Sequence, residues 1–226
     1  MLPCQLNIAV DGPAGAGKST VSRAVALALG LSYLDTGSMY RALTWKALQL
    51  HISPNDAERL TALAGDTIWS LTGSGAEAEL LMDGQPLPKE IRSDQVTALV
   101  STVSGHQAVR ETVVRQQRAI CAAGGFIADG RDIATVVMPG ANLKVFLTAS
   151  VAARAERRRL EQGKQLQELP ELTRDIARRD EQDSSREHSP LRQARDAWVL
   201  DTTGMTFDSV VNRILEKARS VCTEGV

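Results

Sequence analysis

The sequence predicts an α/β fold of three layers, in which helices cover both faces of a central parallel sheet of five strands. Five short apolar runs alternate with segments whose apolar residues recur at helical spacing, and strands that alternate with helices form parallel sheets. Of the 226 residues, 43% are hydrophobic and 23% are charged, which is enough apolar material for a full core. We therefore expect a single domain over residues 1–226, with the first strand at the centre of the sheet.

A glycine-rich turn follows the first predicted strand, residues 6–10. Gly12-x-x-x-x-Gly17-Lys18-Ser19 has the spacing of a phosphate-binding P-loop. Its glycines allow backbone angles at which successive N–H groups turn toward an anion. We predict that it binds a nucleoside triphosphate, with Lys18 as a catalytic charge on the outer phosphates; the alternative is a chance glycine turn before Lys-Ser. The expected contacts are Gly12, Pro13, Ala14, Gly15, Ala16, Gly17, Lys18, Ser19 and Thr20.

A helical pattern over residues 21–29 connects this turn to the second predicted strand. The pattern stops at Gly30, which suits the left-handed exit of a helix. Residues 31–34 form the strand, and Asp35 and Thr36 follow at its carboxyl end. Ligands bind at this end of the strands in open α/β sheets, so both residues are candidates for a site.

Two further helices are predicted after the second strand. The first covers residues 38–50 and carries Arg41 in its first turns, from which the guanidinium could reach back to an anion in the cleft. A solvated arginine is the commoner outcome for a single helical arginine. The second helix runs from about residue 56 to residue 64.

The pattern changes between residues 67 and 92, where short strand-like runs replace the helical spacing. Asp83-Gly84 between two such runs indicates a hairpin. We expect a small antiparallel insertion outside the main sheet, which either decorates the fold or helps to close over a substrate. Two helices follow it, over residues 93–104 and 107–123.

The third buried strand, residues 126–129, ends in a carboxylate. A hydrophobic strand that ends in aspartate holds Mg²⁺ in P-loop enzymes, directly or through water, although this signal is weak by itself. The Ser19 hydroxyl is expected to join the coordination. The candidate metal ligands are Ser19, Asp35 and Asp129.

Arginines are concentrated after the fourth predicted strand, residues 143–147. Two helices are expected here, one capped by Ser150 and one over about residues 172–181, before a last strand at residues 198–201 and a closing helix. Such charge runs are ordinarily solvated helix faces. Their number indicates cations that converge on one cleft, as a reaction between two phosphorylated molecules requires. The segment contains Arg154, Arg157, Arg158, Arg159, Arg178, Arg179, Asp183 and Arg186.

Composition excludes several classes of protein. The formal net charge of −1 argues against a nucleic-acid binder, which usually has a strong basic excess. No apolar run approaches the roughly 20 residues of a membrane span, and residues 1–5 lack the layout of a secretion signal, so we expect a cytoplasmic protein with no membrane partner. The cysteines (4, 121 and 222) and the histidines (51, 106 and 188) show neither disulfide nor zinc spacing. Nothing resembles a large apolar interface, so we expect a monomer.

Four longer motifs resemble those of bacterial cytidylate kinases, and the resemblance covers the chain from the P-loop almost to the C-terminus. The motifs are Asp11-Gly-Pro-Ala-Gly-Ala-Gly-Lys-Ser-Thr20, Leu34-Asp-Thr-Gly-Ser-Met-Tyr-Arg41, Val109-Arg110-Glu111 with Arg115-Gln-Gln-Arg118, and Ile127-Ala-Asp-Gly-Arg-Asp132. The resemblance implies a P-loop NTPase fold with three parts. These are a core (about 1–37, 124–150 and 191–226), a nucleoside-monophosphate-binding region with the β insertion (about 38–123) and a helical lid (about 151–190).

The resemblance also implies transfer of the γ-phosphoryl group of ATP to CMP or dCMP, with Mg²⁺ as the cofactor. The acceptor phosphate is already anionic, so this chemistry needs positioning and charge neutralisation rather than a general base. By resemblance, Arg41, Arg131 and Arg186 hold the acceptor phosphate, Ser101, Arg110 and Asp132 read the base, Arg179 and Asp183 lie near the sugar, and Thr36 joins the substrate site. Arg154 and Arg158 would close on ATP, and the catalytic residues would be Lys18, Arg131 and Arg158.

Two other functions remain compatible with a P-loop. A small-molecule kinase for a shikimate-like or gluconate-like alcohol would have to activate a hydroxyl and would need fewer arginines at the acceptor site. A nucleotide-dependent switch or binding module is the other alternative, but the sequence has no Asn-Lys-x-Asp guanine motif. An assay with several acceptors separates these possibilities.

Overall fold

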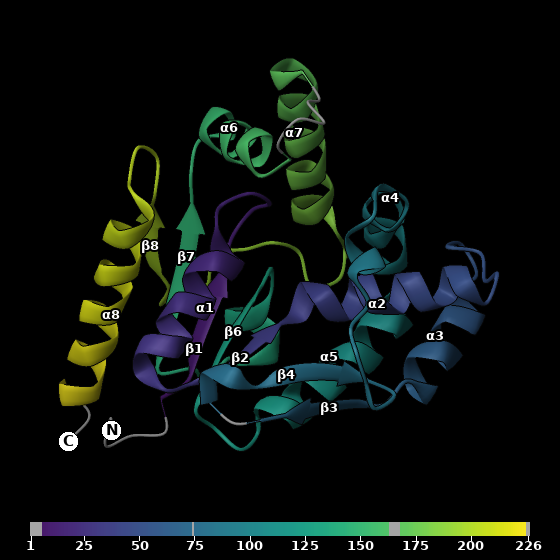
Figure 1. Ribbon diagram of the computed structural model, residues 1–226, viewed down its shortest axis with the longest axis horizontal. Helices are drawn as coiled ribbons and strands as arrows, with labels where there is room; N and C mark the ends of the chain where they lie inside the picture. The colour runs from purple at the N-terminus through teal and green to yellow at the C-terminus, as the bar shows by residue number, and fades with distance from the viewer. Residues whose placement is uncertain (1–5, 74, 163–167, 225–226) are drawn as a thin grey trace.

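The computed structural model describes residues 6–73, 75–162 and 168–224 and contains the predicted parallel sheet (Figure 1). Its five strands have the order β2-β6-β1-β7-β8, and all of their pairings are parallel. The strand that precedes the glycine-rich loop is therefore central, which confirms the prediction. The strands are β1 (Ile8–Asp11), β2 (Ser32–Asp35), β6 (Phe126–Gly130), β7 (Leu143–Thr148) and β8 (Trp198–Asp201).

Helices cover both faces of this sheet and give the three predicted layers (Figure 1). Ile8 and Val10 pack on one face with α1 and α8, whereas Ala9 packs on the opposite face with α2 and α5. Successive residues of a strand point to opposite faces, so the uninterrupted apolar run of β1 contributes to both cores. These helices are α1 (Lys18–Leu29), α2 (Thr36–Gln49), α5 (Gln107–Cys121) and α8 (Phe207–Glu224).

The predicted insertion is a separate antiparallel sheet of three strands, in the order β3-β4-β5. Asp83 and Gly84 connect β4 to β5 with φ values of 53° and 76°, the left-handed geometry of a two-residue hairpin turn. Met82 packs with Ala42 of α2 and Ile91, which attaches the insertion to the helical part. The elements of this region are α3 (Ala57–Asp66), β3 (Trp69–Thr72), β4 (Glu79–Met82), β5 (Gln85–Pro86) and α4 (Asp94–Val103), with 3-10 turns at Gly75–Glu77 and Lys89–Arg92.

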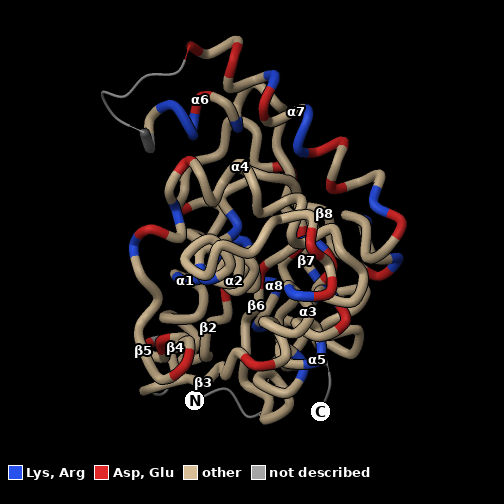
Figure 2. Tube along the Cα trace, turned by 90° about the vertical axis from the view of Figure 1, so that its right-hand side faces the viewer, with Lys and Arg blue, Asp and Glu red and all other residues tan. Residues whose placement is uncertain are grey.

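The arginine-rich segment forms two packed helices, α6 (Val151–Gln162) and α7 (Leu169–Ser185), beyond the carboxyl ends of the strands (Figure 1). Ala155, Leu172 and Ile176 form a small apolar core between them. Figure 2 shows Lys and Arg alternating with Asp and Glu along α7. This helix is longer than the predicted 172–181, because Pro170 lies in its first turn, where proline is tolerated. Of the predicted polar segment 162–171, residues 163–167 lie outside the described part.

Other element boundaries differ from the prediction by a few residues, and the 3-10 turns and one π-helical turn were not predicted. Helix α2 begins at Thr36 rather than at residue 38, because the Asp35 carboxylate accepts a hydrogen bond from Ser38 N at 2.9 Å and caps the helix. A π-helical turn, Ile133–Val137, follows β6. Its first amides bond to a side chain from another strand, so no local pattern could indicate it.

The structure also places the cysteines and bears on the metal and membrane classes considered from composition. Cys121 and Cys222 are buried, and Cys4 lies outside the described residues. Across the described ranges, no three His, Cys, Asp or Glu side chains come together as a metal cluster. Nor does any helix within them have both the length and the apolar character to cross a bilayer.

Gly12→Ala is expected to lower the free energy of unfolding by about 2–5 kcal/mol, the sum of backbone strain and steric overlap. The φ of Gly12 is 150°, and a Cβ added there would lie 1.9 Å from the carbonyl oxygen of Leu147 in β7. Gly30→Ala is the matched control, since Gly30 also has a positive φ of 67° but no atom within 4 Å of an added Cβ. Thermal unfolding measures both variants, and an equal loss in the two would contradict the steric explanation.

Candidate active site

The loop between β1 and α1 has the backbone geometry of an anion cradle. Gly12, Gly15 and Gly17 have φ values of 150°, 75° and 85°, in the region that favours glycine. Gly17 directly precedes α1, so the loop lies at the positive end of that helix. The residues predicted to contact a triphosphate therefore belong to one continuous turn and the first residues of its helix.

The Lys18 ammonium group lies inside this loop. The residue is 7% exposed, and its Nζ donates a hydrogen bond to the carbonyl oxygen of Pro13 at 2.9 Å. Burial, together with the nearby charge of Arg131, lowers the pKa of Lys18 to about 7, although Asp129 and Asp11 act in the opposite direction. Phosphate oxygens in the loop would supply the negative charge that keeps this lysine protonated.

The predicted metal ligands Ser19 and Asp129 are in direct contact. The Ser19 hydroxyl donates to Asp129 Oδ2 at 2.8 Å, and the Tyr33 hydroxyl donates to Asp129 Oδ1 at 2.7 Å. Burial and the neighbouring Asp35 raise the pKa of Asp129 to about 6. A hydroxyl and a carboxylate are the hard oxygen ligands that Mg²⁺ prefers, and Mg²⁺ completes its shell with water and substrate phosphates. The residues present therefore fit this ion.

Asp35, the third predicted metal ligand, has several partners of its own. Its carboxylate caps α2, accepts from the Ser38 hydroxyl at 2.6 Å and forms an ion pair with Arg92 at 3.4 Å. It is near enough to Asp129 to influence the pKa of that residue. A role for Asp35 at the metal stays a prediction.

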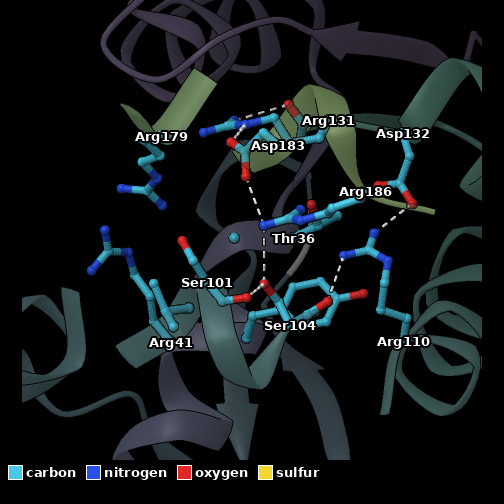
Figure 3. A pocket seen from close by; sticks show the side chains of 14 residues that line it. Thr36, Arg41, Ser101, Ser104, Arg110, Arg131, Asp132, Arg179, Asp183 and Arg186 are labelled. Carbon is cyan, nitrogen blue, oxygen red and sulfur yellow. Dashed lines mark hydrogen bonds and ion pairs between the residues drawn. The ribbon is translucent and has the colours of Figure 1, made fainter. Parts of the chain in front are cut away.

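A pocket next to the loop, called the acceptor pocket below, is lined by every residue predicted to bind the acceptor (Figure 3). Its lining contains five arginines and two aspartates, so positive charge is in excess. Figure 3 shows Arg41 and Arg179 at one end of the pocket and Arg110 and Asp132 at the other. The predicted residues in this lining are Thr36, Arg41, Ser101, Arg110, Arg131, Asp132, Arg179, Asp183 and Arg186.

A buried ion pair forms one end of the pocket. Arg110 Nη2 lies 2.6 Å from Asp132 Oδ2, and the two residues are 3% and 4% exposed. Arg110 Nη1 donates to the carbonyl oxygen of Ser104 at 3.2 Å, and the guanidinium lies 5.1 Å from the centroid of the Tyr40 ring. Although burial disfavours its charge, Tyr40 and Asp132 hold the pKa of Arg110 above its usual value.

A second carboxylate, Asp183 of α7, lies between two arginines of the pocket. Arg131 Nε and Arg186 Nη2 are 2.7 Å and 2.6 Å from its two oxygens. Burial alone would raise the pKa of Asp183, but Arg131 and Arg186 hold it below the usual value. This carboxylate aligns two guanidinium groups from different segments and leaves their other N–H groups to bind an anion.

Arg41 and Arg179 form the more cationic end of the pocket. Arg41 Nη1 donates to the Thr97 hydroxyl at 2.9 Å. Burial and neighbouring arginines lower the pKa of Arg41 and that of Arg179 to about 10. Both remain charged at neutral pH, so their mutual repulsion makes this end of the pocket favourable for a dianion.

Comparison with known proteins decides the family. The family model described as Cytidylate kinase matches residues 8–220 of the chain. The chain belongs to the cytidylate kinase family. This confirms the resemblance that the sequence motifs indicate.

Members of the family differ in length and domain content. A cytidylate kinase from Halalkalibacterium halodurans is 45% identical, with 93% of this chain and 96% of that protein covered. A bifunctional pantoate ligase/cytidylate kinase from Parasynechococcus marenigrum is 49% identical, and the match covers 94% of this chain but 43% of that protein. The chain therefore spans less than half the length of the bifunctional relative. A solved structure of an uncharacterized protein from Eubacterium ventriosum shares the fold alone, with a TM-score of 0.54 and 10% identity over 95% of this chain and 99% of that one.

Two arginines of α6 occupy different places around the P-loop. Arg154 donates to the carbonyl oxygens of Ala149 and Ala14, both at 2.9 Å, and forms an ion pair with Asp180 of α7 at 2.6 Å. Its guanidinium thus connects α6 and α7 to the loop. Arg158 lines a cleft with Ala14 and Arg179, on the side of the loop that faces the acceptor pocket. Contact of Arg154 and Arg158 with ATP stays a prediction.

Sequence reasoning gave no role to four residues of this cytidylate kinase site. Tyr40 and Ser104 line the pocket, and each lies one helical turn from a predicted residue on the same face, which is the signal that could have found them. Tyr33 and Asp11 act through hydrogen bonds to residues distant in the sequence. No local sequence pattern indicates hydrogen bonds to residues that are distant in the sequence.

Arg157 is a further residue whose place was not predicted. It donates to the hydroxyl and carbonyl oxygens of Thr202 at 2.9 Å and 2.7 Å. It borders a second pocket next to the P-loop, whose apolar wall includes Met205 and Phe207. The pocket lies on the α8 side of the loop, away from the acceptor residues.

Proposed function

We propose that the chain transfers the γ-phosphoryl group of ATP to CMP or dCMP and produces ADP with CDP or dCDP. The observation that carries this proposal is the acceptor pocket, which has a buried Arg110–Asp132 pair at one end and arginines at the other. Membership of the cytidylate kinase family supports it. The reaction needs no general base, because the attacking phosphate oxygen is already ionised at neutral pH.

Cytosine recognition is assigned to the end with the ion pair. Cytosine presents an exocyclic amine beside ring acceptors, so a carboxylate oxygen of Asp132 accepts from the amine while Arg110 or the Ser101 hydroxyl donates to the ring. Uracil has an oxygen where cytosine has the amine, and Asp132 would then face an acceptor. The pocket therefore favours cytosine by hydrogen-bond polarity.

Phosphate binding is assigned to Arg41, Arg131 and Arg186, with Arg179 and Asp183 beside the sugar and Thr36 at the wall. Ion pairs with Asp183 hold Arg131 and Arg186 in fixed orientations. Preoriented guanidinium groups lose little entropy on binding and stabilise the charge that spreads over the transferring phosphoryl group. We therefore assign Arg131 a catalytic role as well as a binding role.

ATP binding is assigned to the P-loop, from Gly12 to Thr20. Lys18 neutralises the outer phosphates, and Arg158 approaches them from the lid. When bound, Mg²⁺ neutralises further phosphate charge, and Ser19, Asp35 and Asp129 would hold it. The apolar pocket beside Arg157 suits the adenosine part of ATP.

The proposal includes the division into core, monophosphate-binding region and lid, with the boundaries predicted from the sequence. Closure of the last two over bound nucleotides would exclude water, which otherwise competes for the phosphoryl group. We also propose that the chain acts as a monomer in the cytosol, where its nucleotide substrates are found. Its support is that one chain supplies both nucleotide sites.

Phosphoryl transfer to a panel of acceptors tests the function. ADP release is measured with CMP, dCMP, UMP and AMP, with shikimate and gluconate, and without acceptor. We expect turnover to be highest with CMP or dCMP. Release without acceptor would indicate an ATPase, turnover only with an alcohol would indicate a small-molecule kinase, and no turnover would indicate a binding role.

Asp132→Ala is expected to lower kcat/KM for CMP by about 10–100-fold and to reduce the CMP-to-UMP ratio by about tenfold, since the cytosine amine loses its acceptor in a closed pocket. Steady-state kinetics with both acceptors measures this. Asp196→Ala is the control, because Asp196 also pairs with a cation, Lys144 at 2.7 Å, but has an exposed side chain that does not line the pocket. An unchanged CMP-to-UMP ratio in folded Asp132→Ala would show that Asp132 orients Arg110 instead of reading the base.

A further inference from the structure

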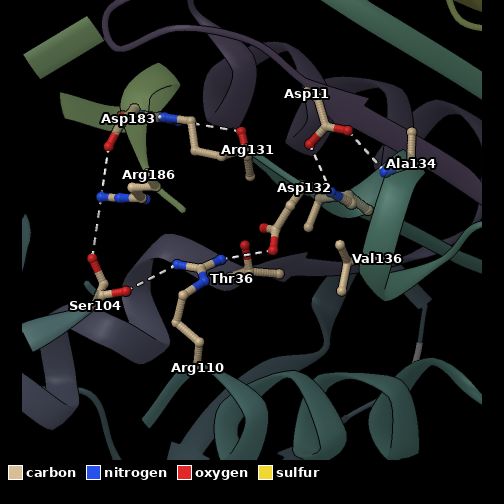
Figure 4. Close-up of polar contacts among 12 residues, drawn as sticks. Asp11, Thr36, Ser104, Arg110, Arg131, Asp132, Ala134, Val136, Asp183 and Arg186 are labelled. Atoms are coloured by element: carbon tan, nitrogen blue, oxygen red, sulfur yellow. Dashed lines mark hydrogen bonds and ion pairs between the residues drawn. The ribbon is translucent and has the colours of Figure 1, made fainter. Parts of the chain in front are cut away.

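Asp11 is a buried carboxylate at the end of the central strand, directly before the P-loop. It is 2% exposed, and in the sheet it pairs with Gly130 of β6. Its position in the P-loop motif would suggest a role toward ATP. Its side chain, however, turns away from the loop and crosses to the segment after β6 (Figure 4).

Both carboxylate oxygens of Asp11 accept hydrogen bonds from the backbone of the π-helical turn. Oδ1 accepts from Ile133 N and Oδ2 from Ala134 N, each at 2.8 Å. Amides in the first turn of a helix have no partner within the helix. Asp11 therefore caps this turn from a distant strand, with two bonds to an ionised acceptor, which are stronger than neutral ones.

The capped turn starts at the residues that form the acceptor pocket. The Asp132 carbonyl oxygen accepts from Val136 N at 2.8 Å and Val137 N at 3.1 Å, so the peptide of Asp132 belongs to the turn. Only Arg131 and Asp132 separate Gly130, held by the sheet, from Ile133, held by Asp11. The two anchors on either side limit how the Asp132 side chain can be oriented.

The side chains of Asp132 and Arg131 diverge, so that Asp132 points toward Arg110 and Arg131 toward Asp183 (Figure 4). The Asp132 carboxylate meets Arg110, whereas Arg131 meets Asp183. A rotation of the peptide after Asp132 would displace the carboxylate within the ion pair. Hydrogen-bond readout of a base depends on such placement, because these bonds weaken steeply with misalignment.

We propose that Asp11 is a positioning residue for the acceptor base, which acts by fixing the turn that orients Asp132. The proposal rests on the proposed function and adds that a residue of the P-loop motif controls acceptor recognition rather than ATP binding. The raised pKa of Asp11, about 6 because of its burial, supports a structural carboxylate in a closed environment. Burial of a charge is tolerated here because both oxygens have partners.

Asp11→Asn tests the proposal, because an amide has the same shape but can accept from only one of the two N–H groups. We expect the Kd for CMP, measured by titration calorimetry without ATP, to rise about tenfold. The ratio of kcat/KM for CMP to kcat/KM for UMP is expected to fall about tenfold. The KM for ATP is expected to stay within about twofold. Asp56→Asn is the matched control, since Asp56 also caps a helix, with Oδ1 accepting from Arg59 N at 3.0 Å, but is only half-buried and does not line the pocket.

Thermal unfolding first establishes that the Asp11→Asn variant is folded, so that its kinetics can separate a positioning role from a merely structural one. A folded Asp11→Asn variant with an unchanged CMP-to-UMP ratio, or with the KM for ATP raised as much as that for CMP, would overturn the proposal. If Asp11→Asn does not fold, Asp11→Ser is measured in the same way, because its hydroxyl can still accept from one amide. A parent protein that neither binds nor phosphorylates CMP would contradict the proposed function itself. A parent that phosphorylates CMP, together with a variant whose CMP-to-UMP ratio equals that of the parent, would contradict only the role of Asp11.

Discussion

Lys18→Ala is expected to lower kcat/KM for CMP by about 10³-fold, because Lys18 is the one charged side chain between Gly12 and Thr20 and is proposed to neutralise the outer phosphates of ATP. The fold is expected to persist. The melting temperature should be unchanged or higher, since burial lowers the pKa of Lys18 to about 7, and a buried lysine with a lowered pKa destabilises the folded state near neutral pH. Steady-state kinetics and thermal unfolding measure the two effects.

The sign of the stability effect follows from proton linkage. The pKa of Lys18 is lower in the folded state than its usual value of 10.5, so the unfolded chain binds more protons between these values and the parent gains stability as pH rises through that window. Lys18→Ala should lack this dependence. Lys217→Ala on α8 is the control, because Lys217 is exposed and distant from the loop. A folded Lys18→Ala variant within about tenfold of the parent rate would contradict the P-loop assignment.

Arg131→Ala is expected to lower kcat by about 10²-fold and to raise KM for CMP by about tenfold, since the proposed role of its guanidinium is to bind the phosphoryl group more strongly as charge develops in the transition state. Arg131→Lys should recover part of the kcat, because a point charge replaces a planar fork. Asp183 keeps Arg186 as a partner in both variants, so the fold should survive. Steady-state kinetics with CMP at saturating ATP measures the effects on kcat and on KM separately.

Arg159→Ala is the control for this variant. Arg159 also pairs with a carboxylate, Glu156 at 2.6 Å, but the pair is on the open surface of α6. Its removal is expected to change kcat by less than about twofold, because exposed ion pairs contribute little. If Arg131→Ala raised KM and left kcat unchanged, Arg131 would bind the acceptor equally in the ground and transition states, and its catalytic role would be wrong.

The sequence by itself was sufficient for the fold class, the central place of the first strand and the family. These features depend on neighbours within a few residues, so the sequence alone indicates them. They are the glycine spacing before a helix, the strand runs that alternate with helical patterns, and the Asp83-Gly84 turn. The acceptor residues were also found from motifs, and the structure brings them into one pocket. Positions one helical turn from a predicted residue, such as Tyr40 after Thr36, lie at the limit of what local spacing indicates.

Only the tertiary structure decided the partners of the charged residues. Asp11 reaches a turn 122 positions away, Arg110 meets Asp132, and Arg154 meets the P-loop carbonyl of Ala14. In sequence these groups are indistinguishable from solvated charges, because an aspartate or an arginine carries no local sign of which distant partner it will meet. A buried charge acquires a partner only when separate strands and helices pack together and exclude water, so its role is a property of the assembled fold.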